Sequence, residues 1–234
     1  MKMKNKKVEQ IADKKNHQEF LRAKRRGEPL LERSIPFKIE KPLILIVCEG
    51  KNTEPSYFKQ FKLTSATIKS VGEGYNTISL VNRAMQLSAE KKYDQVWCVF
   101  DKDDFPESDF NDAVIIASAN GFGVAYSNQS FEYWLILHFD DHQGGGMNRK
   151  LYNKKINSLL KPFKITYEGN DNKIITDDFF ELLEGIDVNS GKERKILAIE
   201  RAKRNLASFN QTNPAKEESS STVFRLVEEL VKYT

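Results

Sequence analysis

Four short apolar runs alternate with longer segments in which apolar residues recur at helical spacing. The first run, Leu43–Cys48, lies between Pro42 and Gly50 and is rich in β-branched side chains, which predicts a strand buried on both faces. The longer segments predict amphipathic helices. The predicted strands are residues 43–48, 66–71, 95–100 and 123–126, and the predicted helices between them are residues 53–63, 77–92 and 108–119.

This alternation predicts an α/β fold with a mostly parallel four-stranded sheet flanked by helices, because parallel neighbours need crossover helices. A strongly apolar helix is predicted over residues 127–139, followed by a glycine run at 144–146. Beyond it the pattern is mainly helical, over residues 151–160, 177–183, 192–209 and 222–231. We therefore divide the chain into a leader (1–40), an α/β core (41–142) and a helical C-terminal region packed on the core (143–234).

Positive charge is concentrated in the leader. Residues 1–40 hold 12 Lys/Arg and 6 Asp/Glu, a net charge of +6, which leaves −2 for the rest of a chain whose net charge is +4. Three interpretations stay open: an arm that binds nucleic-acid phosphates, a solvated tail that is partly disordered or helical, and a docking surface for a protein. The densest basic cluster is Arg22, Lys24, Arg25 and Arg26.

Two further features bear on the cellular compartment. No apolar run approaches the roughly 18 residues of a membrane span, and the Lys-rich N-terminus lacks the apolar segment of a secretory signal. We therefore expect a cytoplasmic protein that does not enter the membrane. Cys48 and Cys98 lie inside predicted strands, where we expect them to pack as small hydrophobic side chains without a disulfide.

Carboxylates follow two of the predicted strands. Glu49-Gly50 ends the first, and Asp101, Asp103 and Asp104 follow the third. The carboxyl ends of parallel strands meet at one edge of a sheet, where open α/β sheets bind ligands, so we expect these acids to converge. Clustered like charges are unfavourable unless a cation neutralises them. Because hard divalent cations prefer oxygen ligands, the pattern predicts a Mg²⁺ or Mn²⁺ site.

A structural interpretation of the same acids stays open, since Asp and related residues often cap helices in loops. Glu132 lies in the first turn of the apolar helix, where the helix dipole alone favours a carboxylate, so its role is undecided. His138 is interpreted as a half-buried histidine of that helix, and His142, beside Asp140 and Asp141, as a surface residue.

The Glu49-Gly50 pair and the later Asp101-x-Asp103 resemble the signature of the Toprim domain, the metal-dependent module of topoisomerases, bacterial primases and OLD-family nucleases. Three further stretches resemble the RloB family of Toprim-like proteins. They are residues 46–54 (IVCEGKNTE), 127–139 (SNQSFEYWLILHF) and 221–223 (STV). The resemblance covers residues 41–234.

Two departures from the related patterns stand out. OLD-like nucleases commonly place a second glutamate four residues after the first, whereas Glu54 is five residues after Glu49. The usual Asn-Pro before the apolar helix is Asn128-Gln129 here, which removes no ligand.

The resemblance implies a metal-dependent nuclease of bacterial anti-phage defence or abortive infection, acting on DNA or RNA. Glu49, Asp101 and Asp103 would hold one or two cations, and two cations can activate water and stabilise the leaving oxygen in phosphodiester hydrolysis. An ABC-type ATPase partner is also implied. No Walker motif occurs in this chain, so the ATPase must be a separate protein.

Further residues are candidates for supporting roles in this chemistry. A lysine near the scissile phosphate would stabilise developing charge; Lys51, Lys154 and Lys155 qualify, and we place Lys154 first. Lys51 and the basic cluster of the leader are candidate nucleic-acid contacts. The candidates for a second cation or for orienting water are Glu54, Asp104, Glu107 and Glu132.

Two other functions remain alternatives. A strand followed by Asp-x-Asp also resembles the haloacid-dehalogenase phosphatases, with Asp101 as nucleophile and Asp103 as acid/base, but that interpretation leaves Glu49 unexplained. Alternatively, the core is a non-catalytic binding or regulatory module of a defence complex. The sequence does not decide between DNA and RNA, one or two metals, or the oligomeric state.

Overall fold

The computed structural model describes residues 12–22, 41–70, 77–143, 145–147, 149–167 and 173–234. The chain divides into two units, residues 1–40 and 41–234. In the first unit, residues 12–22 form a helix whose side chains are exposed. Of the basic cluster in the leader, the structure describes Arg22, which is exposed. Lys24, Arg25 and Arg26 lie outside the described residues.

The second unit is built on a mostly parallel sheet. In its described residues the sheet has five strands in the order β2-β1-β3-β4-β5. The first four pair in parallel, and β5 runs antiparallel to β4. The expectation of four strands thus missed one, because β5 is two serines without a strand pattern. The strands are β1 (Ile44–Cys48), β2 (Ala66–Ser70), β3 (Gln95–Asp101), β4 (Gly123–Asn128) and β5 (Ser220–Ser221).

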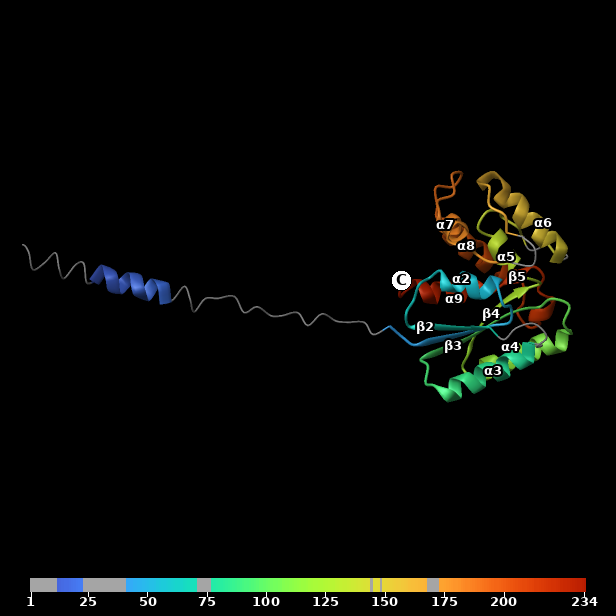
Figure 1. Cartoon of the computed structure of the whole chain (residues 1–234), viewed down its shortest axis with the longest axis horizontal. Helices are drawn as coiled ribbons and strands as arrows, with labels where there is room; N and C mark the ends of the chain where they lie inside the picture. The colour runs from blue at the N-terminus through green and yellow to red at the C-terminus, as the bar shows by residue number, and fades with distance from the viewer. Residues whose placement is uncertain (1–11, 23–40, 71–76, 144, 148, 168–172) are drawn as a thin grey trace, which may run out of the picture. The chain divides into compact units, whose positions relative to one another are not determined.

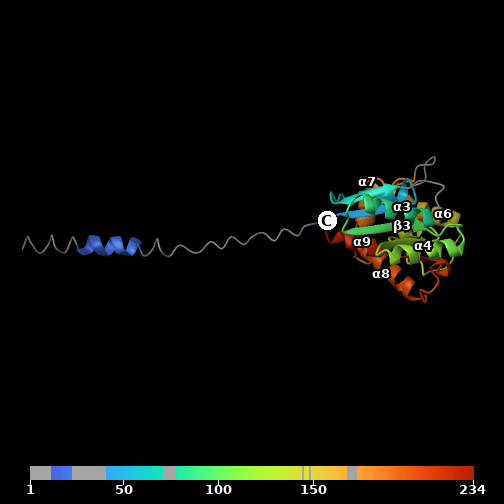
Figure 2. The same cartoon turned by 90° about the horizontal axis from the view of Figure 1, so that it is seen from below.

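Helices cover both faces of this sheet (Figures 1 and 2). α3 and α4 lie on one face, and α2, α5 and α9 lie on the other, with α6, α7 and α8 as a further layer outside them (Figure 1). The α-helices are α2 (Thr53–Lys59), α3 (Thr77–Glu90), α4 (Glu107–Ala119), α5 (Glu132–Ile136), α6 (Arg149–Leu160), α7 (Asp177–Glu184), α8 (Arg194–Ala207) and α9 (Val223–Val231).

Strand alternation divides the core into two clusters. Leu45 and Val47 of β1 pack with α3 and α4, whereas Ile44, Ile46 and Cys48 face α2 and the C-terminal helices. All five residues are fully buried, as expected for a strand covered on both faces. Cys98 packs in the α3–α4 cluster, on the opposite face from Cys48, and both thiols are free.

The apolar helix after β4 is shorter than predicted and more deeply buried. α5 spans Glu132–Ile136, and every residue from Phe131 to His138 is buried. His138 is therefore fully buried instead of half-buried, and burial lowers its pKa to about 3. Its Nδ1 lies 3.0 Å from the carbonyl oxygen of Trp134. His142 is partly buried.

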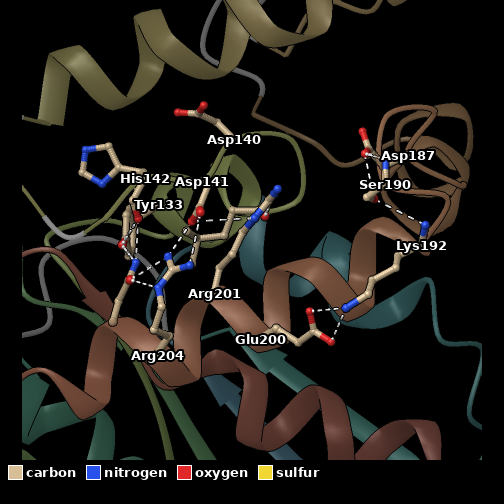
Figure 3. A network of polar contacts seen from close by, with 12 residues as sticks. Tyr133, Asp140, Asp141, His142, Asp187, Ser190, Lys192, Glu200, Arg201 and Arg204 are labelled. Atoms are coloured by element: carbon tan, nitrogen blue, oxygen red, sulfur yellow. Dashed lines mark hydrogen bonds and ion pairs between the residues drawn. The ribbon is translucent and has the colours of Figure 1, made fainter.

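Polar contacts fasten α8 to α5 and to the segment that follows α5 (Figure 3). Arg204 forms an ion pair with Asp141, with Nη1 lying 3.2 Å from Oδ2. Arg201 donates to the carbonyl of Leu137 at 2.8 Å. Asn205 Nδ2 donates to the Tyr133 hydroxyl at 2.7 Å. These contacts fix the helix that carries Glu132.

Among the described helices, none has both the length and the apolar character needed to cross a membrane.

Candidate functional site

The structure brings Glu49 and Asp101 together at the carboxyl edge of the sheet. β1 and β3 are paired so that Cys48 lies opposite Val99, and the Glu49 main-chain N–H donates to the Val99 carbonyl at 2.9 Å. Oε2 of Glu49 then accepts a hydrogen bond from the Asp101 main-chain N–H at 3.2 Å. The two acids, far apart in sequence, are therefore direct neighbours because their strands are adjacent and parallel.

Asp101 is the most buried acid of this edge, with 7% of its surface exposed. Asp101 lies two residues after Val99 in β3, so the two residues are on the same face of the sheet, and Val99 packs in the core cluster on the α2 and α5 side. Its Oδ2 accepts a hydrogen bond from the Phe131 main-chain N–H at 3.0 Å, immediately before α5. The Asp101 carboxyl is thus held between the end of its own strand and the start of α5.

The pKa of Asp101 is raised well above its ordinary value. Burial is the largest cause, because it disfavours the charged carboxylate, and the negative charges of four other acids add to it. The acids that raise it are Glu54, Asp103, Glu132 and Glu49. We call these five residues the acidic cluster. A bound cation would relieve the part of this shift that comes from repulsion between the acids.

Gly50 allows Glu54 to approach the end of β1. Glu54 is a buried residue of the first turn of α2. A methyl group at position 50 would lie 2.8 Å from the carboxyl carbon of Glu54, which is closer than side chains normally pack. The glycine after Glu49 therefore has a steric role: it leaves room for a second carboxylate beside the first.

Asp103 lies in the tight loop after β3. Its φ is +41°, in the left-handed region that Asp tolerates better than most residues. The Asp103 main-chain N–H donates to the Gln129 carbonyl at 3.0 Å. Lys102 supports the loop by donating to the Phe105 carbonyl at 2.6 Å. The loop is thus attached to the segment between β4 and α5, which keeps Asp103 near Asp101.

Both carboxylate oxygens of Glu132 already accept hydrogen bonds. Oε1 accepts from Lys173 Nζ at 2.9 Å and from the Tyr167 hydroxyl at 3.0 Å, and Oε2 accepts from the Ser130 hydroxyl at 2.6 Å. Burial alone would raise the pKa of Glu132, but the Lys173 charge and the hydrogen bonds lower it below its ordinary value. Thr53 of α2 joins the group through the Tyr167 hydroxyl, at 2.9 Å. This arrangement makes Glu132 an anchor for its neighbours.

Lys173 and Tyr167 are the residues that sequence analysis missed. Lys173 is paired with a glutamate 41 positions earlier in the chain, and no motif marks either residue. One signal was available: a carboxylate at the start of a strongly apolar helix needs a buried cation or hydrogen-bond donors. The sequence could not show which of its 37 Lys and Arg residues would supply it.

Several other candidates have exposed side chains. Asp104 is exposed, although it follows Asp103 directly. Glu107 is exposed at the start of α4 and lies 3.5 Å from Lys216 Nζ. Lys51 is exposed in the loop before α2. Lys154 lines a cavity on α6, and within the described part of the chain it forms no ion pair with the acids of the cluster.

The donor chemistry of the cluster fits a hard divalent cation, since its ligand atoms are carboxylate oxygens that repel one another. The side chains, however, are not positioned for metal binding. Across the described residues, no group of three or more Asp, Glu, His or Cys side chains is arranged to hold a metal ion. Glu49 and Asp101 instead each accept a main-chain hydrogen bond. Binding a cation would therefore require these side chains to rotate toward a common point.

Comparison with known proteins identifies the family. A family model described as "RloB-like protein" matches residues 44–230, which include the whole acidic cluster and all five strands. Neither the curated proteins nor the solved structures contain a match. The chain belongs to the RloB-like protein family.

Proposed function

We propose that this protein is a divalent-metal-dependent nuclease with a Toprim-like core, which hydrolyses phosphodiester bonds of DNA or RNA. The observation that carries the proposal is the placement of Asp101: it is buried at the carboxyl edge of a parallel sheet, and its main-chain N–H donates to Glu49 Oε2 at 3.2 Å. Burial, and then four neighbouring acids, raise the pKa of Asp101. Such an edge is where open α/β folds bind ligands. Strongly perturbed carboxyl groups in such a position are typical of functional sites.

In the proposed site, Glu49, Asp101 and Asp103 would hold Mg²⁺ or Mn²⁺, with Glu54 beside them. The bound cation would supply a Lewis acid and an activated water for attack on phosphorus. The chain's own contribution is to gather these acids at one edge of the sheet. Gly50 lets Glu54 approach, and Lys173 neutralises Glu132, so the charge of the remaining acids is directed at the cation.

The contact between Glu49 and Asp101 favours this mechanism over a haloacid-dehalogenase-like phosphatase. That alternative has no role for Glu49, whereas Glu49 Oε2 lies 3.2 Å from the Asp101 nitrogen.

Membership of the RloB-like family supports a wider proposal about the biological role. In that proposal the nuclease acts in the bacterial cytoplasm, in anti-phage defence or abortive infection, together with a separate ABC-type ATPase. A non-catalytic module that binds such an ATPase is the alternative that the following experiment distinguishes.

The test is cleavage of plasmid, single-stranded DNA and tRNA by purified protein in Mg²⁺ or Mn²⁺, with EDTA as the metal-free control. We expect Glu49→Gln and Asp101→Asn each to lower the cleavage rate at least about 100-fold, since each removes a charged ligand. Asp112→Asn is the matched control, because Asp112 is an exposed acid on α4 outside the acidic cluster. It should leave the rate unchanged.

Two results would overturn the proposal. Cleavage that survives both ligand substitutions would show that the activity does not come from this site. Absence of cleavage on every substrate, together with stable binding to an ABC-type ATPase that is indifferent to metal, would favour the binding module instead.

A further inference from the structure

A cavity of about 480 Å³ lies on α6, outside the acidic cluster. Its described lining consists of two lysines and two asparagines: Lys150, Asn153, Lys154 and Asn157. These positions are spaced three and four residues apart, so they form one face of the helix. A neighbouring face of α6 is buried through Tyr152, Ile156 and Leu160. The cavity volume is within the range of pockets that bind small ligands.

The asparagines of this face are held by hydrogen bonds. Asn157 Oδ1 accepts from the Tyr167 main-chain N–H at 3.2 Å, and its Nδ2 donates to the Asn153 carbonyl at 2.9 Å. Asn153 Oδ1 accepts from Lys173 Nζ at 3.1 Å. The oxygen of Asn153 is thus occupied, which leaves its amide N–H₂ as a hydrogen-bond donor for a ligand.

The same contacts join the cavity to the acidic cluster. Lys173 Nζ bridges Asn153 Oδ1 and Glu132 Oε1, at 3.1 and 2.9 Å. Glu132 in turn is one of the acids that raise the pKa of Asp101. Lys155 on the other side of α6 pairs with Asp140 at 2.9 Å and helps to fix the helix. The cavity is therefore two hydrogen bonds from a member of the acidic cluster.

We propose that this cavity binds a backbone phosphate of the nucleic-acid strand that the acidic cluster cuts. The inference rests on the proposed function and assigns the substrate a place beside the site of cleavage. Two ammonium groups and an amide N–H₂ group form a donor set that suits a phosphodiester anion. Lys154 makes no ion pair with a residue in the described ranges, so its charge is available to a ligand.

This assignment gives Lys154 a role different from the one expected from sequence. A lysine that stabilises charge at the scissile phosphate would have to contact the acids or their cation. Among the described residues, Lys173 forms an ion pair with one acid of the cluster, Glu132. Lys154 instead shares its helix face with Lys150, where both ammonium groups can contact a phosphate that is not cleaved.

The test compares Lys150→Gln/Lys154→Gln with Lys161→Gln/Lys164→Gln. Both double variants remove two exposed lysines. Lys161 and Lys164, however, lie at the start and just after the end of the 3-10 helix Lys161–Phe163, outside the described lining of the cavity. Binding of fluorescein-labelled single-stranded RNA and DNA of one sequence is measured by anisotropy in EDTA, over a series of KCl concentrations. Melting curves verify that all variants are folded.

We expect the cavity variant to bind at least one of the two strands about 10-fold more weakly. The slope of log affinity against log salt should fall by about 0.7, the value for one neutralised phosphate of a single strand. The control variant should lower the slope by less than half of that. Equal slopes for the two variants on both strands would overturn the inference. It would also be overturned if inorganic phosphate binding fell in the cavity variant while strand binding did not, since the cavity would then hold small anions.

These measurements separate the inference from the proposed function, because binding in EDTA involves no cleavage. A lowered slope together with a protein that cuts nothing would reject the nuclease and keep the phosphate site. Metal-dependent cleavage with an unchanged slope would reject the phosphate site alone.

Discussion

Removal of the Lys173 side chain tests how the acidic cluster is held together. In the Lys173→Ala variant, Glu132 would keep its burial, with 4% of its side chain exposed, and lose its one ion-pair partner among the described residues. Breaking a buried pair on one side costs about 3–5 kcal/mol. We expect about 2–3 kcal/mol here, because the Lys173 side chain is 31% exposed and Tyr167 and Ser130 still donate to Glu132.

The assay is urea unfolding of wild type, Lys173→Ala, Glu132→Gln and the double variant at several pH values. In the Glu132→Gln background, loss of Lys173 should cost less than about 1 kcal/mol, since no buried charge is left behind. The lowered pKa of Glu132 gives stability that is present above its unfolded value of about 4.3 and is lost as pH falls through the lower folded value. The cost of Lys173→Ala should therefore shrink in acid. Equal costs in both backgrounds, or a cost independent of pH, would refute the reasoning.

Three further substitutions give separate results. Gly50→Ala places a methyl group against the buried Glu54 carboxylate, so the free energy of unfolding measured in urea should fall by about 1–3 kcal/mol. Gly145→Ala is the control: its methyl group meets open space, and the free energy of unfolding should change by less than about 0.5 kcal/mol. Asp101→Asn should raise the Tm of the metal-free protein. Because the pKa of Asp101 is raised in the folded state, its carboxyl group destabilises the fold increasingly as pH rises from the unfolded pKa towards the folded pKa. The gain in Tm should be largest at alkaline pH and vanish below about pH 4, and a lower Tm of the variant at pH 8 would contradict it. Asn205→Ala removes the donor to the Tyr133 hydroxyl and to the His142 carbonyl, so thermal unfolding should show a loss of about 1–3 kcal/mol, and an unchanged Tm would show that α8 is held by other contacts.

The parts of the fold that follow from local pattern were predictable from sequence. β1 and β3 are apolar on both faces, so their burial and their order among helices follow from residue type alone. The meeting of Glu49 with Asp101 follows from topology, because parallel strands present their carboxyl ends at one edge. Strand β5 escaped prediction, since Ser220 and Ser221 pair with β4 through tertiary context and not through propensity.

The internal arrangement of the site depends on contacts that no local pattern encodes. Asp103 and Asp104 are adjacent and chemically equal in the sequence, yet the positive φ of Asp103 helps to shape a turn in which Asp104 is exposed. Glu132 could be interpreted as a ligand or as a residue favoured by the helix dipole. Its pairing with Lys173, which follows α6 and is 41 residues later in the chain, assigns it a third role, that of an anchor.

The central claim is that acids from separate strands share one cation, and direct binding of Mn²⁺ tests it. Calorimetric or paramagnetic-resonance titration would compare wild type with Glu49→Gln, Asp101→Asn and the exposed control Asp112→Asn. We predict that wild type and the control bind Mn²⁺ with equal affinity, and that each ligand substitution weakens binding at least about 10-fold. Equal binding by all four proteins, or no binding by wild type, would contradict the claim.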